Sequence, residues 1–353
     1  MEPLKSGSTI GILGGGQLGR MLAMAAAQLG YRCVGYAPEG DNVAAPVSAA
    51  FLTRAWEDRA ALARFAAECE AVTWEFENVP VTALDAIPAE KLFPPRRALE
   101  VAQDRLEEKR FVEALGGRTA PFATVDTPND LARAIESIGI PGILKTRREG
   151  YDGKGQWRIA SAGDRDLLSS LRQPAIYEGL VEFEAEFSVI LVRGRDDEVR
   201  FWDSPRNAHV GGILDRSLFP AGAAIGAQSE AARDLAKKVA DALGYIGVLT
   251  LEFFATGDGP VFNEMAPRVH NSGHWTIEGA ATSQFENHIR AVAGLPLGDT
   301  RSVARTVEMI NLIGDAAADA HNHLTGGDTH LHLYGKAEAR EGRKMGHVTR
   351  LER

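Results

Sequence analysis

The chain has little cysteine, no excess of basic residues and no long apolar run in its 353 residues. Its two cysteines, Cys33 and Cys69, belong to no C-x-x-C pair, which argues against a disulfide framework and a thiolate metal site. The net charge of -9 argues against a polyanion-binding surface, although a few local cations suffice for a small anionic ligand. No apolar run approaches the ~20 residues that cross a bilayer, and the first residues show no signal-peptide core. We therefore expect a cytoplasmic globular protein without nucleic-acid or membrane partners.

The first hundred residues alternate apolar strands with helices, which predicts a parallel α/β unit. The strands are expected over residues 9–13, 32–36 and 71–76, and the helices over residues 17–29 and 58–68. We expect this unit to end near the proline pair at positions 94 and 95.

The remainder of the chain predicts α+β structure rather than a second doubly wound unit. Helices are expected over residues 104–115, 128–137, 227–243 and 285–293. Strands are expected over residues 142–146, 175–179, 183–192, 248–255, 260–265, 307–313 and 329–333. The turn over residues 256–259 predicts that the strands on either side of it pair as an antiparallel hairpin.

Gly14, Gly16 and Gly19 form a G-x-G-x-x-G motif between the first strand and the first helix, where backbone amides can hold a phosphate. A dinucleotide site also needs an acidic residue at the end of the second strand. The chain offers Glu39 there, after a turn that contains Pro38. This departure disfavours NAD, and it leaves two interpretations, another phosphate-bearing ligand or a turn needed only for close packing.

A glycine-rich loop over residues 150–156 follows Lys145, which ends an apolar strand. A flexible loop with nearby lysines suits nucleotide phosphates, which need backbone donors and a cation. The loop lacks the spacing of a P-loop, and an exposed turn is the alternative.

Two glutamates in the predicted hairpin are the strongest physical signal for a metal. Strict alternation places Glu252 on one face with Phe254, and Glu264 on one face with Phe262. The carboxylates would then lie about 5 Å apart across the hairpin, and two like charges at that distance favour a cation such as Mg²⁺ between them. Asn263 would point to the opposite face, and a solvent-facing carboxylate is the alternative.

Other polar groups are candidate ligands as well. Glu178 and Glu186 flank a short segment between strands, where a carboxylate suits ribose hydroxyls, although exposed strand glutamates are common. The loop over residues 265–274 concentrates arginine, histidine and asparagine, which is typical of a site. The cationic tail over residues 334–347 predicts either a phosphate clamp or a solvated basic hairpin. His321, His323 and His330 fit no zinc-binding pattern.

Together these segments resemble the ATP-grasp ligases, and specifically the N5-carboxyaminoimidazole ribonucleotide synthetases. The resemblance covers nearly the whole chain and rests on residues 14–20, 74–78, 150–156, 267–276 and 342–347 together with Glu252 and Glu264. It implies a Rossmann-like pre-ATP-grasp domain over residues 1–103, a two-lobed ATP-grasp domain over residues 104–298 and a small β-rich domain over residues 299–353.

The resemblance also implies roles for particular residues. The ATP ligands would be Arg105, Lys145, Gly150, Tyr151, Asp152, Gly153, Lys154, Gly155, Gln156, Glu178, Gly179, Leu180, Val181, Glu186, His209, Asn263 and Glu264. The ligands of the second substrate would be Gly16, Gln17, Leu18, Glu75, Tyr151, Asp152, Lys154, Asn271, Lys336, Arg343 and Lys344. Glu252 and Glu264 would hold Mg²⁺, and the catalytic candidates are Arg268, His274, Lys154 and Asp152.

The activity implied by the resemblance is the ATP-dependent carboxylation of 5-aminoimidazole ribonucleotide by bicarbonate in purine biosynthesis. Its products are N5-carboxyaminoimidazole ribonucleotide, ADP and phosphate, its intermediate is carboxyphosphate, and the family suggests a homodimer. The alternatives are an ATP-grasp ligase for another substrate, an NAD-dependent oxidoreductase and a non-catalytic nucleotide sensor.

Overall fold

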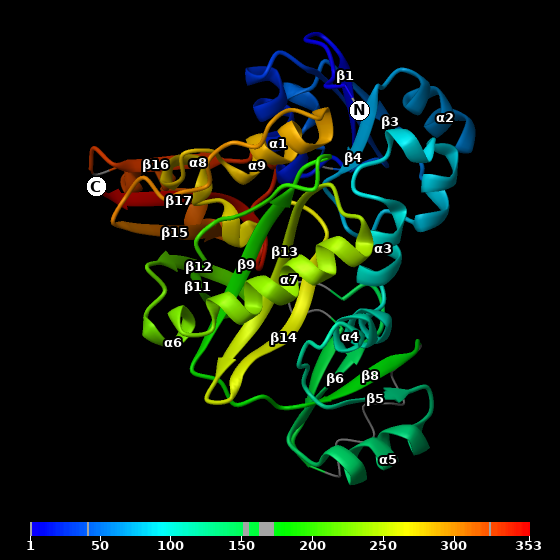
Figure 1. Ribbon diagram of the computed structural model, residues 1–353, viewed down its shortest axis with the longest axis vertical. Helices are drawn as coiled ribbons and strands as arrows, with labels where there is room; N and C mark the ends of the chain where they lie inside the picture. The colour runs from blue at the N-terminus through cyan, green and yellow to red at the C-terminus, as the bar shows by residue number, and fades with distance from the viewer. Residues whose placement is uncertain (1, 41, 151–154, 162–172, 325) are drawn as a thin grey trace.

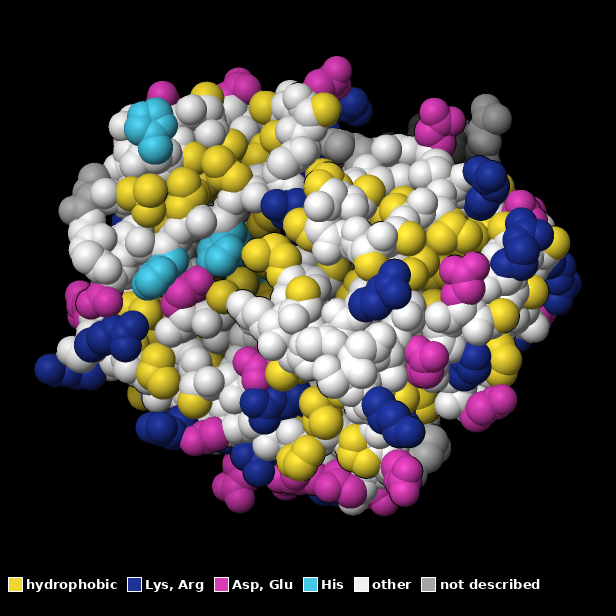
Figure 2. Space-filling view, turned by 90° about the horizontal axis from the view of Figure 1, so that it is seen from above, with side chains coloured by type: hydrophobic (Ala, Val, Ile, Leu, Met, Phe, Trp, Pro, Cys, Tyr) yellow, Lys and Arg dark blue, Asp and Glu magenta, His cyan; other side chains and the backbone are white. Residues whose placement is uncertain are grey.

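The computed structural model describes residues 2–40, 42–150, 155–161, 173–324 and 326–353, and these residues form three sheets (Figure 1). Figure 2 shows basic and acidic side chains interspersed over the face seen from above. In the described part of the chain, no helix has the length and apolar character that crossing a bilayer requires.

The N-terminal sheet is parallel, with the strand order β3-β2-β1-β4. Its elements are β1 (Thr9–Leu13), α1 (Gln17–Gln28), β2 (Arg32–Ala37), β3 (Ala50–Thr53), α2 (Arg59–Ala67) and β4 (Ala71–Trp74). The predicted parallel α/β unit is thus present, with β3 as a strand that the sequence pattern did not reveal. β4 ends at Trp74, two residues before the predicted end, because the chain leaves the sheet at Glu75.

The smaller antiparallel sheet has the strand order β5-β8-β6-β7, and helix α5 packs against it. Its elements are β5 (Phe122–Val125), α5 (Pro128–Ile138), β6 (Gly142–Thr146), β7 (Gln156–Ile159) and β8 (Ala175–Gly179). A capping box between Thr127 and Asp130 begins α5, whose Leu131 packs against Leu144 and Tyr177 in a separate small core.

Two helices connect this sheet to the N-terminal unit, α3 (Arg96–Ala102) and α4 (Arg105–Ala114). The side chain of Asp104 accepts a hydrogen bond from the amide of Leu106 and caps α4, as its position before the helix predicts. Figure 1 shows α4 between the smaller sheet and the large one, so its side chains can reach the space between them.

The large sheet is antiparallel and contains nine strands in the described residues. Its order is β14-β13-β9-β11-β12-β15-β17-β16, and β10 also pairs with β9. Its strands are β9 (Ala185–Arg193), β10 (Val199–Phe201), β11 (Arg206–Val210), β12 (Ile213–Phe219), β13 (Gly247–Thr256), β14 (Gly259–Ala266), β15 (Thr306–Ile313), β16 (Thr329–Leu333) and β17 (Lys344–Glu352). Its helices are α6 (Ala223–Gly226), α7 (Ser229–Leu243), α8 (Thr276–Gly279) and α9 (Gln284–Ala293).

The C-terminal strands continue the large sheet instead of forming a sheet of their own. β15 pairs with β12 on one side and with β17 on the other. The basic tail is therefore not a solvated hairpin from residue 344 onward, since Lys344 begins a strand whose Val348 and Thr349 are fully buried.

One hydrophobic core joins the N-terminal unit to the large sheet. Leu13 and Trp74 belong to the same cluster as Phe187 and Phe253. The indole Nε1 of Trp74 donates to the carbonyl of Pro267 across this junction, with a distance of 2.9 Å. The end of β4 is thus fixed against the loop that follows β14.

Candidate functional site

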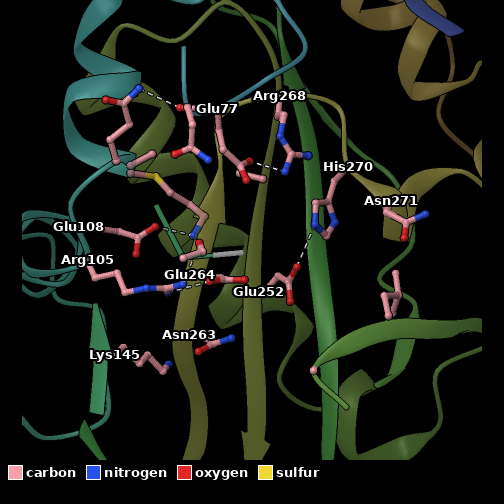
Figure 3. A pocket seen from close by; sticks show the side chains of 18 of the residues that line it. Glu77, Arg105, Glu108, Lys145, Glu252, Asn263, Glu264, Arg268, His270 and Asn271 are labelled. Carbon is pink, nitrogen blue, oxygen red and sulfur yellow. Dashed lines mark hydrogen bonds and ion pairs between the residues drawn. The ribbon is translucent and has the colours of Figure 1, made fainter. Parts of the chain in front are cut away.

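A pocket of about 600 Å³ lies where the three sheets meet. Its walls come from the turn after β1, the end of β4, α4, the smaller sheet, β13, β14 and the loop after β14 (Figure 3). The chemistry-bearing residues that line it include Glu75, Glu77, Arg105, Glu108, Lys145, Glu186, His209, Glu252, Asn263, Glu264, Arg268, His270, Asn271 and Lys344. Segments from the whole length of the chain therefore converge on one cavity.

The two glutamates of the hairpin lie directly opposite each other, because Glu252 on β13 pairs with Glu264 on β14. Both side chains line the pocket, in agreement with the prediction that the two carboxylates lie close together across the hairpin. The expectation that Phe262 shares the face of Glu264 is wrong. Phe262 is 1% exposed and contacts the ring of Phe253 in the core.

The reason is a β-bulge. Phe253 pairs with Phe262, so Asn263 is an extra residue on β14 between two aligned pairs. The bulge breaks the strict alternation, and both Asn263 and Glu264 line the pocket. Asn263 therefore lines the pocket, although strict alternation predicts that it points to the opposite face of the strand.

Each hairpin carboxylate contacts a nitrogen-bearing side chain of the protein. Arg105 donates to Oε2 of Glu264 at 2.9 Å, and Nε2 of His270 lies 3.0 Å from Oε1 of Glu252. Burial acts to raise the pKa of Glu264, but Arg105 and Lys145 lower it to about 2. Glu264 is therefore ionised at neutral pH and available to a cation.

Glu108 is a further carboxyl group in the pocket, and its role could not be read from the sequence. It is 2% exposed, and its Oε1 accepts a hydrogen bond from the amide of Met265 at 2.7 Å. Burial raises the pKa of Glu108 to about 8, and the neighbouring Glu264 adds to this effect. No sequence spacing signals this residue, because it lies on a helix about 150 positions before the hairpin.

Lys145 reaches the pocket from β6, and its Nζ lies 3.0 Å from Oε2 of Glu178. The other carboxylate oxygen of Glu178 lies 3.4 Å from Nζ of Lys109, which is 1% exposed. Burial acts to raise the pKa of Glu178, but the two lysines lower it overall. The carboxylate of Glu178 is thus ion-paired with two lysines, and Glu178 is not among the described residues that line the pocket.

Glu186 on β9 and His209 on β11 line another wall, with His209 Nδ1 2.6 Å from Glu186 Oε2. Burial acts to lower the pKa of His209, but the glutamate raises it overall. The stacked rings of Phe183 and Phe254 lie beside them and give this wall an apolar part. Gly179 ends β8 and Leu180 and Val181 follow it, and these three are not among the pocket-lining residues that the structure describes.

The glycine-rich turn after β1 is occupied by a side chain of the protein itself. The carboxylate of Glu75 accepts hydrogen bonds from the amides of Gly16, at 2.8 Å, and Gly19, at 3.2 Å. A Cβ on Gly14 would lie 2.5 Å from Glu75 Oε1, so the glycines leave space for this carboxylate. Burial raises the pKa of Glu75, against the effect of the two amides. Gly16, Gln17 and Leu18 line the pocket beside it.

The loop after β14 contributes three pocket residues. Arg268 forms an ion pair with Glu77, which the sequence analysis did not single out, and Asn271 lies beyond His270 in Figure 3. His274 was expected to act next to Arg268, but its side chain is 0% exposed and lies against the rings of Phe285 and His347. Burial lowers the pKa of His274 well below its usual value. The loop turns inward at residues 271–273, so His270 reaches the pocket and His274 does not.

The cations of the C-terminal tail divide into two groups. Lys344 lines the pocket, whereas Lys336 and Arg343 are not among its described lining residues. The charge of Lys336 nevertheless acts on Glu75 and lowers its pKa, and Arg343 Nη1 donates to the carbonyl of Glu338.

The glycine-rich loop is described only at its ends. Gly150 and Gln156 line the pocket, Arg105 donates to the carbonyl of Gly150, and Gly155 lies outside the described lining. The predicted ligands Tyr151, Asp152, Gly153 and Lys154 lie outside the described residues.

Comparison with known families agrees with this architecture. Residues 110–285 match the ATP-grasp domain family, residues 7–103 the ribonucleotide synthetase preATP-grasp domain and residues 308–353 the phosphoribosylaminoimidazole carboxylase C-terminal domain. Fold and site thus define an ATP-grasp ligase. A relative in Brucella melitensis, an N5-carboxyaminoimidazole ribonucleotide synthase, is 51% identical over 99% of this chain and 98% of its own. The chain belongs to the N5-carboxyaminoimidazole ribonucleotide synthase family.

Solved structures give the same result. The synthetase from Thermus thermophilus has a TM-score of 0.89 and is 48% identical, over 98% of this chain and 93% of its own. The synthase from Aspergillus clavatus, in complex with ADP and 5-aminoimidazole ribonucleotide, has a TM-score of 0.89 and is 31% identical. That alignment covers 98% of this chain and 94% of the Aspergillus protein.

Proposed function

We propose that this ATP-grasp ligase carboxylates 5-aminoimidazole ribonucleotide with bicarbonate, in purine biosynthesis, and consumes ATP. One observation carries the proposal. The paired carboxylates Glu252 and Glu264 share a single cavity with the cations Arg105, Lys145 and Lys344. A cavity with these groups suits a reaction between a nucleoside triphosphate and two further anions, bicarbonate and the ribonucleotide.

The nucleotide would lie between the smaller sheet and the large sheet. Lys145 and Arg105 approach from one side and are suited to the phosphates, while the amide of Asn263 lies across from Lys145 (Figure 3). Glu186 offers a carboxylate to the ribose hydroxyls, and Phe183 and Phe254 offer an apolar surface to the base. We propose Gly179, Leu180 and Val181 as backbone partners of the adenine, with Glu178 acting through Lys145.

Glu252 and Glu264 fit a magnesium ion. Mg²⁺ in nucleotide sites takes one or two carboxylates and completes its shell with phosphates and water, and these two carboxylates face each other in one pocket. When bound, the ion would neutralise charge on the triphosphate during phosphoryl transfer. On this proposal Arg105 and His270 hold the carboxylates in place before the ligands arrive.

In the first step an oxygen of bicarbonate attacks the γ-phosphorus in line, and the bond to the leaving ADP breaks. Lys145 and Arg105 stabilise the negative charge that develops on the phosphoryl oxygens. Arg268, His270 and Lys344 line the neighbouring wall and would hold bicarbonate on this proposal. The product of this step is carboxyphosphate.

In the second step the exocyclic amine of the ribonucleotide forms a bond to the carboxyl carbon, or to CO₂ released from it, and phosphate leaves. We propose that the ribonucleotide binds against Gly16, Gln17, Leu18 and Glu75, with Lys336, Arg343 and Lys344 supplying positive charge for its phosphate. We propose that Tyr151, Asp152 and Lys154, which lie outside the described residues, also contact the substrates. Carboxyphosphate hydrolyses readily, so the site has to exclude water during the reaction. We also propose a homodimer, a cytoplasmic location and the division into units at residues 1–103, 104–298 and 299–353.

The test measures ADP release by the purified protein with Mg²⁺ and ATP, with each of bicarbonate and the ribonucleotide present or omitted. Mass detection follows the carboxylated product. ADP release that requires the ribonucleotide and yields this product is expected. Binding of ATP without stimulation by the ribonucleotide would contradict the proposed substrate.

A further inference from the structure

Asn271 is a pocket residue whose amide group is oriented by a second asparagine. It lies in the short helical turn Asn271–Gly273 after β14, and its side chain is 8% exposed. Asn311 lies on β15, outside the described lining of the pocket, and is 4% exposed. We propose that Asn311 is a positioning residue, which fixes Asn271 so that an N–H donor faces an anionic substrate. This inference rests on the proposed function for the identity of that substrate.

The two side chains form a reciprocal amide pair. Nδ2 of Asn271 donates to Oδ1 of Asn311 at 2.9 Å, and Nδ2 of Asn311 donates to Oδ1 of Asn271 at 2.8 Å. The second hydrogen of Asn311 Nδ2 goes to the carbonyl oxygen of Leu214 on β12, also at 2.8 Å. Both hydrogens and one lone pair of the Asn311 amide are therefore used.

The carbonyl of Leu214 decides which way both amides point. A backbone carbonyl can only accept, so the group of Asn311 that faces it must be the nitrogen. The oxygen of Asn311 then faces Asn271 and requires the nitrogen of Asn271 opposite it. A flipped Asn271 would oppose oxygen to oxygen and nitrogen to nitrogen in a buried place, and two hydrogen bonds would be lost.

The fixed orientation has a chemical consequence for the pocket. The oxygen of Asn271 is engaged by Asn311, whereas one of the two Nδ2 hydrogens finds no acceptor among the described residues. Asn271 lines the pocket together with Arg268, His270 and Lys344, and we infer that this hydrogen is available to a ligand there. A donor among cations suits an oxygen of bicarbonate or carboxyphosphate, whereas an exposed carbonyl would repel it.

The position of Asn311 in the sheet makes the pair rigid. Asn311 lies in β15 opposite His347 of β17, and the residues just before it, up to Ile310, pair with β12. β15 thus takes part in the site although none of its described residues lines the pocket, and loss of Asn311 leaves the sheet ladder itself in place.

A double-mutant cycle tests the proposal on the full chain. Asn311→Leu removes the polar group at nearly constant volume, Asn271→Ala removes the donor, and the third variant combines them. We expect Asn311→Leu to lower kcat/KM for bicarbonate about 10- to 100-fold, the range of one hydrogen bond to a charged group, with little change in ADP affinity. If Asn311 acts through Asn271, the double variant loses no more than Asn271→Ala alone.

Asn287→Ala is the matched control. Asn287 is also fully buried, exchanges two hydrogen bonds with the backbone of Gly298 and lies on α9, away from the pocket. The Asn287→Ala variant should be less stable than the wild type and should keep the wild-type kcat/KM for bicarbonate. Losses that simply add in the double variant, or equal losses in ADP affinity, would assign Asn311 a structural role and overturn the proposal.

A readout without turnover separates this proposal from the proposed function. Side-chain amide NMR resonances of Asn271, with ADP bound, should shift when bicarbonate is added to the wild type and should not shift in Asn311→Leu. A wild type that makes no carboxylated product would refute the proposed function, while these resonances still decide the positioning role. Asn271 resonances that respond to bicarbonate in Asn311→Leu as they do in the wild type, or a wild type whose Asn271 resonances do not respond to bicarbonate, would refute the inference.

Discussion

Glu75 occupies the anion position at the glycine-rich turn, with its Oε1 2.8 Å from the backbone nitrogen of Gly16. The amides that would hold a pyrophosphate in a dinucleotide enzyme instead bind a carboxylate of the same chain. This relationship explains why the motif is present although the acidic ribose ligand is missing, and it gives a physical reason against the NAD interpretation.

The fit between Glu75 and the turn predicts that Gly14→Ala is destabilising. Gly14 has φ +115°, and an added Cβ would lie 2.5 Å from Glu75 Oε1. We expect a loss of about 1–3 kcal/mol in the free energy of unfolding by urea, from backbone strain and the displaced carboxylate. Gly40→Ala is the control, because nothing lies within 4 Å of its added Cβ. Equal stabilities of the two variants would show that Glu75 does not require the glycine.

Glu264→Gln is expected to abolish turnover with little effect on folding. The substitution keeps the size of the side chain but removes the charge that pairs with Arg105 and that would hold Mg²⁺. We expect kcat to fall about 100-fold or more, measured as ADP release at saturating Mg²⁺. The exposed Glu90→Gln serves as the control. An unchanged rate in Glu264→Gln would remove the metal assignment.

Lys109→Met is expected to be strongly destabilising. The substitution leaves Glu178 buried with Lys145 alone, and removal of one partner from a buried ion pair costs about 3–5 kcal/mol. Lys109→Met combined with Glu178→Gln should recover part of this loss, because the uncompensated charge is gone. Urea unfolding measures stability, and ADP titration reports whether Lys145 keeps its place. A double variant less stable than Lys109→Met would contradict the charge-balance explanation.

His288 makes stability depend on pH. Val248 donates its amide hydrogen to Nδ1 of this fully buried histidine, Nε2 lies 2.8 Å from Oγ1 of Thr73, and burial lowers the pKa to about 3. Between pH 6.5 and 3 the unfolded chain binds a proton at this residue and the folded chain does not, so its contribution to stability falls as the pH falls.

His288→Gln keeps a donor and an acceptor but cannot titrate. The variant should be less stable at pH 7, and the gap to the wild type should narrow by about 1.4 kcal/mol per pH unit below pH 6.5. Urea unfolding at pH 6.5, 5.5 and 4.5 measures the gap. A constant gap over this range would mean that His288 already titrates normally in the folded protein.

Much of the fold follows from local patterns. β1, β6, β8 and β16 lie at the predicted positions. The short strands β3, β5, β7, β10, β11, β12 and the long β17 were not predicted. Several of them carry mixed polar and apolar residues, and they become strands because a neighbouring strand supplies their hydrogen bonds.

The sequence by itself determined the chemistry of this protein, since the glutamate pair, the strand-borne lysine and the polar loop after β14 could be read from residue type and spacing. Tertiary structure decided which of these groups meet. A single bulged residue in β14 lets the side chain of Asn263 line the pocket. The turn after His270 leaves the side chain of His274 buried outside the pocket. Packing of α4 against β14 adds Glu108 to the pocket. Alternation and spacing describe one element at a time, whereas these outcomes depend on hydrogen bonds and buried contacts between elements far apart in the chain.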